Sequence, residues 1–411
     1  MNRLFKNSGN QLVKKTLLLG AMALVMALPR MNAFAETSSM VLANRLASRI
    51  ATYLPAATIT NMSNSIASGD YVGAAKLATQ STSYGDNFLF NLVAPMCSLA
   101  NTQNVPSNAC IATLQYIAWN NKPWTDALTG NYLATFTAPT GVTAFTAPSA
   151  ANNTHWQAAT TAYLAGQMSY VANMNMVAQT SVNTQMTDPM GVMTVYQAGY
   201  DAANMGTNRR FVEIIMQNFL GVTLDSVRDG SFGTTAAVDR IRQDVQGLAP
   251  DTATFLNTCA TCHGGIDGMA SAFNGFDTSA TTFQLTLQNS VVTKLTSRET
   301  LHAASPGFKE SLNSPSFNSW VINYRTSPYG TFSWGATSGV GANALGQSVV
   351  ATNEFRINMI NRIWNLACGE PPPASELTTV EELASYMLTT AQDQITPMVQ
   401  QVATLPQCLG R

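Results

Sequence analysis

The chain has 411 residues, with 21 Lys and Arg, 22 Asp and Glu, and a formal net charge of −1. Hydrophobic residues make up 46% of it, which is enough for a sizeable core and excludes a wholly disordered chain. Charged residues make up only 10%, far below the roughly 25% of an average globular protein. Because phosphate neutralisation dominates nucleic-acid affinity, a near-neutral chain without a basic block is not expected to bind nucleic acid.

Residues 1–35 have the features of a secretory signal peptide. A basic start is followed by a 12-residue apolar run over 17–28, too short to span a bilayer, and by the small-residue cleavage pattern Ala33-Phe34-Ala35. Cleavage removes five cations and no acids, which leaves 16 Lys and Arg against 22 Asp and Glu and a charge of −6. No later run reaches the ~18 apolar residues of a membrane helix. We expect a soluble periplasmic or secreted protein.

Residues 36–248 are predicted to form an N-terminal helical region. Apolar residues from Phe211 to Phe219 recur with the 3.6-residue period of an amphipathic helix. The Thr/Phe/Ala-rich stretch 135–148 is the best strand candidate, but it lacks convincing alternation and reads as a loop. The helices predicted here are 38–53, a run around 112–119, 156–177 and 208–220.

Residues 249–290 contain a Cys-x-x-Cys-His motif, made by Cys259, Cys262 and His263. Helix positions i, i+3 and i+4 share one face, so both sulfurs can reach the vinyl groups of one porphyrin while the imidazole ligates the iron. The motif is the signature of covalent haem c attachment. We therefore predict one covalent haem c, carried on a short helix of about 252–263.

Two other chemistries share this cysteine spacing. A redox dithiol usually sits in a thioredoxin-like βαβ pattern, which the helix-rich context lacks. A zinc site would need two further Cys or His ligands, and none is spaced nearby. Haem attachment remains the favoured interpretation.

Residues 291–411 are predicted to form a loop and a C-terminal helical region. A helix over 345–367 should stop at Gly369, which is followed by three prolines. The sequence Thr379 to Glu382 has the pattern of a capping box and should open the final helix. The predicted fold class is mainly α: a multi-helix, cytochrome c-like protein with long irregular loops, in which the regions after the signal peptide form one globular unit.

Four cysteines remain outside the haem motif. In an oxidising compartment an even number of them suggests disulfides, and four cysteines allow three pairings. The local pairing, Cys97 with Cys110 and Cys368 with Cys408, is the modest favourite, although the sequence does not choose between the three.

Several segments resemble the planctomycete-type mono-haem cytochrome c family. The motif is followed by Ile266-Asp267, although the family often has proline where Gly268 stands. This resemblance implies the fold and the haem cofactor more than a reaction. The other similar segments, in the order of the family, are 123–132, 191–194, 207–210, 219–221, 272–273, 276–277, Phe355 and 361–364.

The sixth iron ligand decides what a haem can do. Met or His ligation favours electron transfer, whereas an open sixth position favours catalysis at the iron. Met269 is too close to His263 to reach the opposite face of the porphyrin. His302 is our candidate ligand, with a surface-loop role as the plain alternative. The other candidates are Met359, Met387 and Met398.

Two arginines and one histidine have simpler structural interpretations. Arg209 and Arg210 stand at a predicted helix start, where a haem propionate could pair with them, but an ion pair with Glu213 is the simpler interpretation. His155 is interpreted as structural.

The favoured function is that of an exported mono-haem cytochrome that carries single electrons to a redox partner protein the sequence does not identify. One alternative is a haem enzyme, peroxidase-like, with an open distal site. Another is a surface interaction protein in which the haem is structural. Known dihaem-type peroxidases need two haem motifs and this chain has one, so electron transfer is preferred to enzyme activity.

Overall fold

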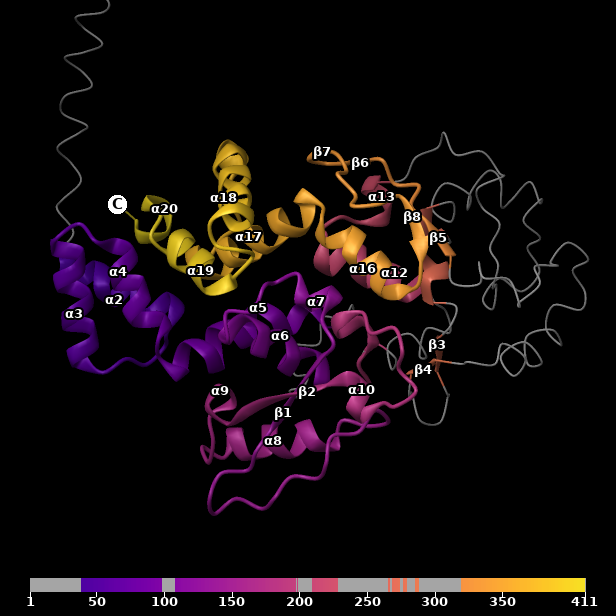
Figure 1. Cartoon of the computed structure of the whole chain (residues 1–411). Helices are drawn as coiled ribbons and strands as arrows, with labels where there is room; N and C mark the ends of the chain where they lie inside the picture. The colour runs from indigo at the N-terminus through magenta and orange to yellow at the C-terminus, as the bar shows by residue number, and fades with distance from the viewer. Residues whose placement is uncertain are drawn as a thin grey trace, which may run out of the picture.

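The computed structural model describes residues 38–97, 108–196, 198, 209–227, 265–266, 268–273, 276–278, 285–287 and 319–410 (Figure 1). Over these residues the protein is mainly helical, which confirms the predicted fold class. The signal peptide predicted at 1–35 and the haem helix predicted at 252–263 lie outside the described residues.

Three helices open the described chain: α2 (Ser39–Ile50), α3 (Ala56–Ala67) and α4 (Tyr71–Thr79). The Ser38 hydroxyl accepts a hydrogen bond from the Val41 N–H at 3.3 Å and caps α2, as expected of serine before an apolar periodic segment. Asp70 caps α4 in the same way, through the Gly73 N–H at 2.8 Å. The helix predicted over 38–53 is therefore confirmed.

The middle of the chain mixes short helices with one two-stranded sheet. Strand β1 (Tyr132–Phe136) pairs antiparallel with β2 (Met174–Ala178), in the register Tyr132 opposite Ala178. The helical elements are η1 (Tyr84–Leu89), α5 (Phe90–Val93), η2 (Ala94–Met96), α6 (Ala109–Trp119), α7 (Asp126–Thr129), α8 (Thr154–Leu164), α9 (Tyr170–Asn173), α10 (Gln179–Val182) and η3 (Gly191–Thr194).

The predicted helix over 156–177 is wrong beyond Leu164. Helix α8 ends there, and Gly166 takes a φ of 67°, a left-handed conformation that glycine adopts at little cost. The chain then enters α9 and β2, where pairing with β1 satisfies the backbone groups. Of the stretch 135–148, only 135–136 belong to a strand.

The helix predicted over 208–220 is confirmed as α12 (Arg209–Ile214) continued by η4 (Ile215–Phe219). The rest of this region contains three two-stranded antiparallel sheets. Their strands are β3 (Phe276–Thr278) with β4 (Leu285–Leu287), β5 (Ser319–Val321) with β8 (Ser338–Val340), and β6 (Thr326–Ser327) with β7 (Gly330–Thr331). Two short helical turns, α13 (Leu224–Val227) and η7 (Ser271–Phe273), complete the region.

The C-terminal region corrects two predictions. The helix predicted over 345–367 is two helices, because Thr352 interrupts the run and accepts the Phe355 N–H at 3.3 Å as the cap of a new helix. Thr379 opens no helix: its hydroxyl donates to Glu376 at 2.8 Å inside a helix that has already begun. The elements are α16 (Ala342–Val350), α17 (Asn353–Cys368), η8 (Ala374–Glu376), α18 (Leu377–Thr389), α19 (Ile395–Ala403) and α20 (Pro406–Leu409). The stop at Gly369 is confirmed, with φ at 84°.

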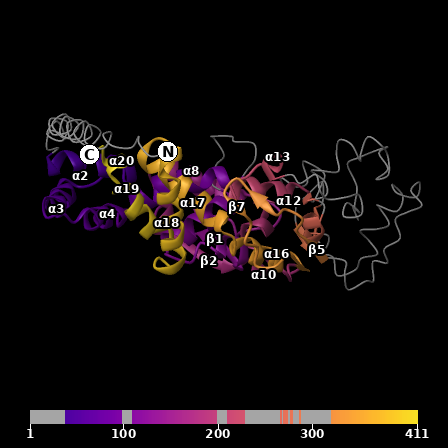
Figure 2. The same ribbon diagram turned by 90° about the horizontal axis from the view of Figure 1, so that it is seen from above.

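The two ends of the described chain pack together. Figures 1 and 2 show α2 and α4 beside α19 and α20. The Arg49 guanidinium donates to the Ala367 carbonyl at 3.0 Å, and Arg45 donates to the Leu409 carbonyl. Both cations meet the carbonyl end of a helix, where the macrodipole favours positive charge. These contacts join residues more than 300 positions apart.

Two disulfides are present, in the local pairing that the sequence modestly favoured. Cys97 bonds to Cys110, a separation of 13 residues, and joins η2 to α6. Cys368 bonds to Cys408, a separation of 40 residues, and joins the end of α17 to α20. One hydrophobic cluster runs through all these elements, with α6 almost entirely buried. Within the described ranges, no helix combines the length and the apolar character needed to cross a membrane.

Candidate functional site

The haem motif and the candidate distal ligand, Cys259, Cys262, His263 and His302, lie outside the described residues. The described chain resumes at Gly265, two residues after His263. The segment that follows the motif packs against several elements of the described fold.

The segment that leaves the motif is anchored in the core. Gly265 lies directly on the ring of Tyr324, so that a Cβ at this position would overlap the ring carbons. Gly268 approaches the Val321 carbonyl of β5, where a Cβ would lie 2.5 Å from the oxygen. Further on, the rings of Phe211 and Phe273 stack with centroids 4.4 Å apart. Since Ile266, Met269 and Ala272 are also buried, the exit of the motif is an apolar and aromatic wall.

The segment 322–334 holds this wall in place. Tyr324, which contacts Gly265, accepts a hydrogen bond at its backbone carbonyl from the Trp334 indole N–H at 2.8 Å. Trp334 in turn stacks on Phe332, with ring centroids 4.5 Å apart. The β6–β7 hairpin lies between Tyr324 and Phe332 in the sequence. Ser327 of this hairpin donates a hydrogen bond to Glu354 of α17.

Helix α17 presents five polar side chains along one face, at positions i, i+4, i+7, i+8 and i+11. We call these residues, Glu354, Asn358, Asn361, Arg362 and Asn365, the α17 polar stripe. Three of them have acceptors or donors on neighbouring elements. Glu354 accepts the Ser327 hydroxyl at 2.6 Å, Asn358 donates to the Asn218 carbonyl at 2.8 Å, and Asn361 donates to the Tyr329 hydroxyl at 3.3 Å.

Of the two other residues of the α17 polar stripe, Asn365 is exposed and Arg362 is partly buried. Its Nε is buried, and with the residues that the structure describes the side chain forms no hydrogen bond and no ion pair. Burial lowers the pKa of its guanidinium to about 10. In the sequence, a single arginine in a helix gives no sign of how its side chain is surrounded.

The three methionines considered as distal ligands are core residues. Met359 lies on α17, Met387 on α18 and Met398 on α19, and all three are fully buried. These helices pack against one another, so the three side chains contribute to the hydrophobic core. Met269 is fully buried as well.

Arg210 has the simpler role that the sequence suggested. Its Nη1 lies 2.7 Å from the Glu213 carboxylate, one turn along the same helix. The side chains are 17% and 31% exposed, so the pair lies close to solvent.

His155 is structural, as expected. Its Nδ1 lies 2.6 Å from the Thr146 carbonyl, and its Nε2 accepts the Phe136 N–H at 2.9 Å. The ring therefore carries its proton on Nδ1 and joins the loop after β1 to the strand itself. Burial lowers the pKa of His155, because the charged imidazolium would lose solvation and the acceptor at Nε2.

This assignment predicts an acid-sensitive contribution to stability. The unfolded chain takes up a proton near the ordinary histidine pKa of 6.5, whereas the folded chain resists protonation. The free energy of unfolding therefore falls as the pH drops below about 6.5, since the unfolded state then binds more protons. His155→Gln should lose about 1 kcal/mol at neutral pH and should flatten this part of the curve. Urea unfolding of both proteins across the pH range measures the difference, and parallel curves would contradict it.

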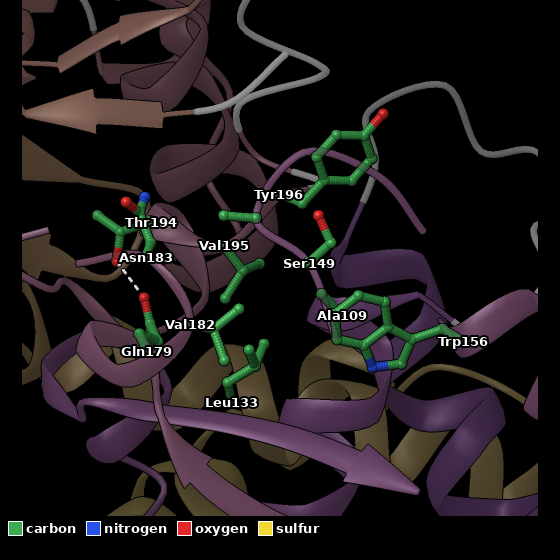
Figure 3. Close-up of a pocket in the computed structure, with 11 residues that line it drawn as sticks. Ala109, Leu133, Ser149, Trp156, Gln179, Val182, Asn183, Thr194, Val195 and Tyr196 are labelled. Carbon is green, nitrogen blue, oxygen red and sulfur yellow. Dashed lines mark hydrogen bonds between the residues drawn. The ribbon is translucent and has the colours of Figure 1, made fainter. Parts of the chain in front are cut away.

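One small cavity lies beside the β1–β2 sheet (Figure 3). Its volume is about 20 Å³, room for a single water molecule. Leu133, Trp156 and Val182 line it, and the polar lining residues Gln179 and Thr194 already bond to each other at 2.8 Å. The cavity is too small for a substrate. Over the described ranges there is no cluster of three or more His, Cys, Asp or Glu side chains able to hold a metal ion.

Comparisons with known proteins identify no relative: no family model, no curated protein and no solved structure matches the chain.

Proposed function

We propose that the mature protein is an exported mono-haem c-type cytochrome that carries single electrons. The observation that carries this proposal is the motif of Cys259, Cys262 and His263. Cys259 and Cys262 would hold the porphyrin through thioether bonds, and His263 would ligate the iron. The bound haem would supply a one-electron couple between ferric and ferrous iron, while the protein sets its potential and its solvent access.

The residues after the motif fit a haem. A porphyrin is a large, flat, apolar group with two carboxylates, and it needs an apolar wall together with cationic or polar groups for its acidic edge. Gly265 and Ile266 lead from the motif into a buried aromatic wall that includes Phe273 and Tyr324. The α17 polar stripe carries a cation, Arg362, whose buried Nε has no hydrogen-bond acceptor among the described residues. A side chain at position 265 would overlap the ring of Tyr324, so only glycine lets the backbone after the motif pack directly against this ring.

The compartment is part of the proposal. Two disulfides are typical of exported proteins, because cytosolic reductants keep thiols reduced. They agree with the export predicted from residues 1–35. Both bridges use cysteines outside the haem motif, so Cys259 and Cys262 stay available for thioether bonds.

Expression with a cytochrome c maturation system tests the proposal. The wild-type protein should keep a single haem per chain after acid–acetone extraction and should give the pyridine haemochrome spectrum of haem c. Cys259→Ala combined with Cys262→Ala should lose this covalent haem completely, because no thioether bond can form.

The matched control removes a pair of cysteines that has a structural role instead. Cys97→Ala combined with Cys110→Ala breaks one disulfide but should keep the covalent haem. Haem that extracts freely from the wild type, or a wild type that acquires none, would refute the proposed function.

A further inference from the structure

The β1–β2 sheet has two outer edges, one on each strand. The ladder between the strands uses alternate residues: at its ends the Gln179 N–H donates to the Asn131 carbonyl and the Thr137 N–H to the Asn173 carbonyl. In an antiparallel pair, the residues between these direct their N–H and C=O groups away from the partner strand. Residues 132, 134 and 136 of β1 therefore form one outer edge, and residues 174, 176 and 178 of β2 form the other.

Side chains of neighbouring helices cover the outer edge of β1. The Ala134 N–H donates to the Thr113 hydroxyl of α6 at 3.0 Å, and the Ala134 carbonyl accepts the Trp156 indole N–H of α8 at 2.9 Å. The Phe136 N–H donates to His155, also on α8. No further strand can pair along this edge, because its donors and acceptors are already used.

The outer edge of β2 has no such cover. Among the described residues, none forms a hydrogen bond with the N–H or the carbonyl of Met176, at the centre of this edge. The Met176 residue is 39% exposed, and Asn175 beside it is exposed as well. Edge strands of natural proteins usually carry a charge, a proline or a bulge that prevents pairing with another strand. Strand β2 has no charge and no proline, and its register runs without a bulge.

The surface around this open edge is uncharged. No Lys, Arg, Asp or Glu occurs in the sequence between Asp126 and Asp188. Both strands, α8 and the loop that connects them lie within this stretch, and they form the lower part of the molecule in Figure 1. An acidic or basic partner would find no charge to pair with here. Two copies of this chain, which carry identical charges, can meet here without like-charge repulsion.

We propose that β2 pairs antiparallel with β2 of a second copy, about a two-fold axis at Met176. The Met176 N–H would donate to the Met176 carbonyl of the second copy and the reverse bond would form as well, while Met174 would lie opposite Ala178 of the second copy. Met174, Met176 and Ala178 share one face of the strand, so apolar side chains would meet across the axis. The joined sheet would have four strands and no open edge on β2, whereas an isolated pair of strands is only marginally stable.

The test measures the molar mass of the exported chain by light scattering over a range of protein concentrations. Wild-type protein should have the mass of two chains. Met176→Lys alone and Met176→Glu alone should each shift to the mass of one chain, because like charges would lie directly opposite, with Cα atoms ~5.5 Å apart. An equimolar mixture of the two variants should recover the two-chain mass, since opposite charges then face each other.

The matched control is Leu164→Lys. Leu164 is 78% exposed at the end of α8, the helix that covers the β1 edge, so this variant adds the same charge away from the open edge. It should keep the two-chain mass. Circular dichroism shows whether each variant is folded, and either charged variant at Met176 is sufficient to test the edge if the other does not fold.

Four results would overturn the proposal. A wild type with the mass of one chain at every concentration would exclude self-association. A two-chain mass that persists in folded Met176→Lys or Met176→Glu would place the interface on another surface. Dissociation of Leu164→Lys would mean that added charge alone separates the copies. A mixture of the two Met176 variants that stays at the mass of one chain would exclude a two-fold axis at this residue.

Discussion

Replacing Arg356 by alanine is expected to lower the free energy of unfolding by about 3–5 kcal/mol, because it leaves a buried aspartate without its partner. The Nε and Nη2 atoms of Arg356 donate to the two carboxylate oxygens of Asp393 at 2.7 and 2.9 Å. Both residues are buried, with exposed fractions of 5% and 8%. The loss would be measured by urea unfolding at neutral pH.

The effect is large because Arg356 joins three parts of the chain. Its Nη1 also donates to the Val350 and Thr352 carbonyls, where α16 ends and α17 begins. Asp393 lies in the turn between α18 and α19, and its carbonyl accepts the Trp124 N–H at 2.7 Å. Removal of one side chain therefore loosens the break between two helices and the turn between two others.

A second ion pair provides the control. Arg210→Ala removes the partner of Glu213, but both of these side chains are partly exposed and one helical turn apart. Water can solvate the remaining carboxylate, so the expected loss is about 0.5 kcal/mol or less. Arg356→Met combined with Asp393→Asn should recover part of the stability of Arg356→Ala, because no buried charge remains. Equal losses in Arg356→Ala and Arg210→Ala would contradict the argument.

Local sequence patterns were sufficient for much of the fold. Ser38 begins a helix through its side-chain hydroxyl, and Gly369 ends a helix through its left-handed backbone. Both helix ends could therefore be predicted without knowledge of distant contacts. The mainly helical class followed in the same way, whereas the sequence favoured the observed disulfide pairing only modestly over the two others. Thr352 carried the same kind of capping signal, but it sits inside a continuous apolar run that hides the break between α16 and α17.

Other features depend on residues far apart in the sequence. Strand β2 forms because β1, more than 35 residues earlier, supplies its hydrogen-bonding partners. Read alone, residues 174–178 continue an apolar helix pattern. The pairing of Arg356 with Asp393 spans 37 residues. The sequence around each of them does not indicate that the charged side chain is buried rather than exposed.

The candidate site shows the same division. A motif of five consecutive residues predicts the proximal side of the proposed haem, since the porphyrin would set the spacing of the motif. No comparable sequence motif identifies the ligand on the distal side of the iron. His302 and the three core methionines could be proposed only by elimination.

The identity of the distal ligand produces the largest spectroscopic effect that we expect. An electron carrier needs a strong sixth ligand, because a fixed coordination sphere limits reorganisation and excludes other ligands. Met359, Met387 and Met398 are fully buried in the packing of three helices. His302 lies outside the described residues, and we propose it as the ligand.

Wild-type ferric protein should then be fully low-spin, without the weak far-red charge-transfer band of methionine ligation. His302→Ala should convert to high-spin iron and should bind carbon monoxide when reduced, since the sixth position becomes open. The control is His155→Gln, which changes the only other histidine outside the haem motif and should stay low-spin. Optical and electron paramagnetic resonance spectra distinguish these states.

Two other outcomes would each change the assignment. A far-red band in the wild type would mean that a methionine ligates the iron, and Met359→Ala, Met387→Ala and Met398→Ala would then identify which one. A wild type that is already high-spin, with His302→Ala unchanged, would mean that the sixth position is open. Because exogenous ligands and peroxide react at an open iron, that result would favour a haem enzyme over an electron carrier.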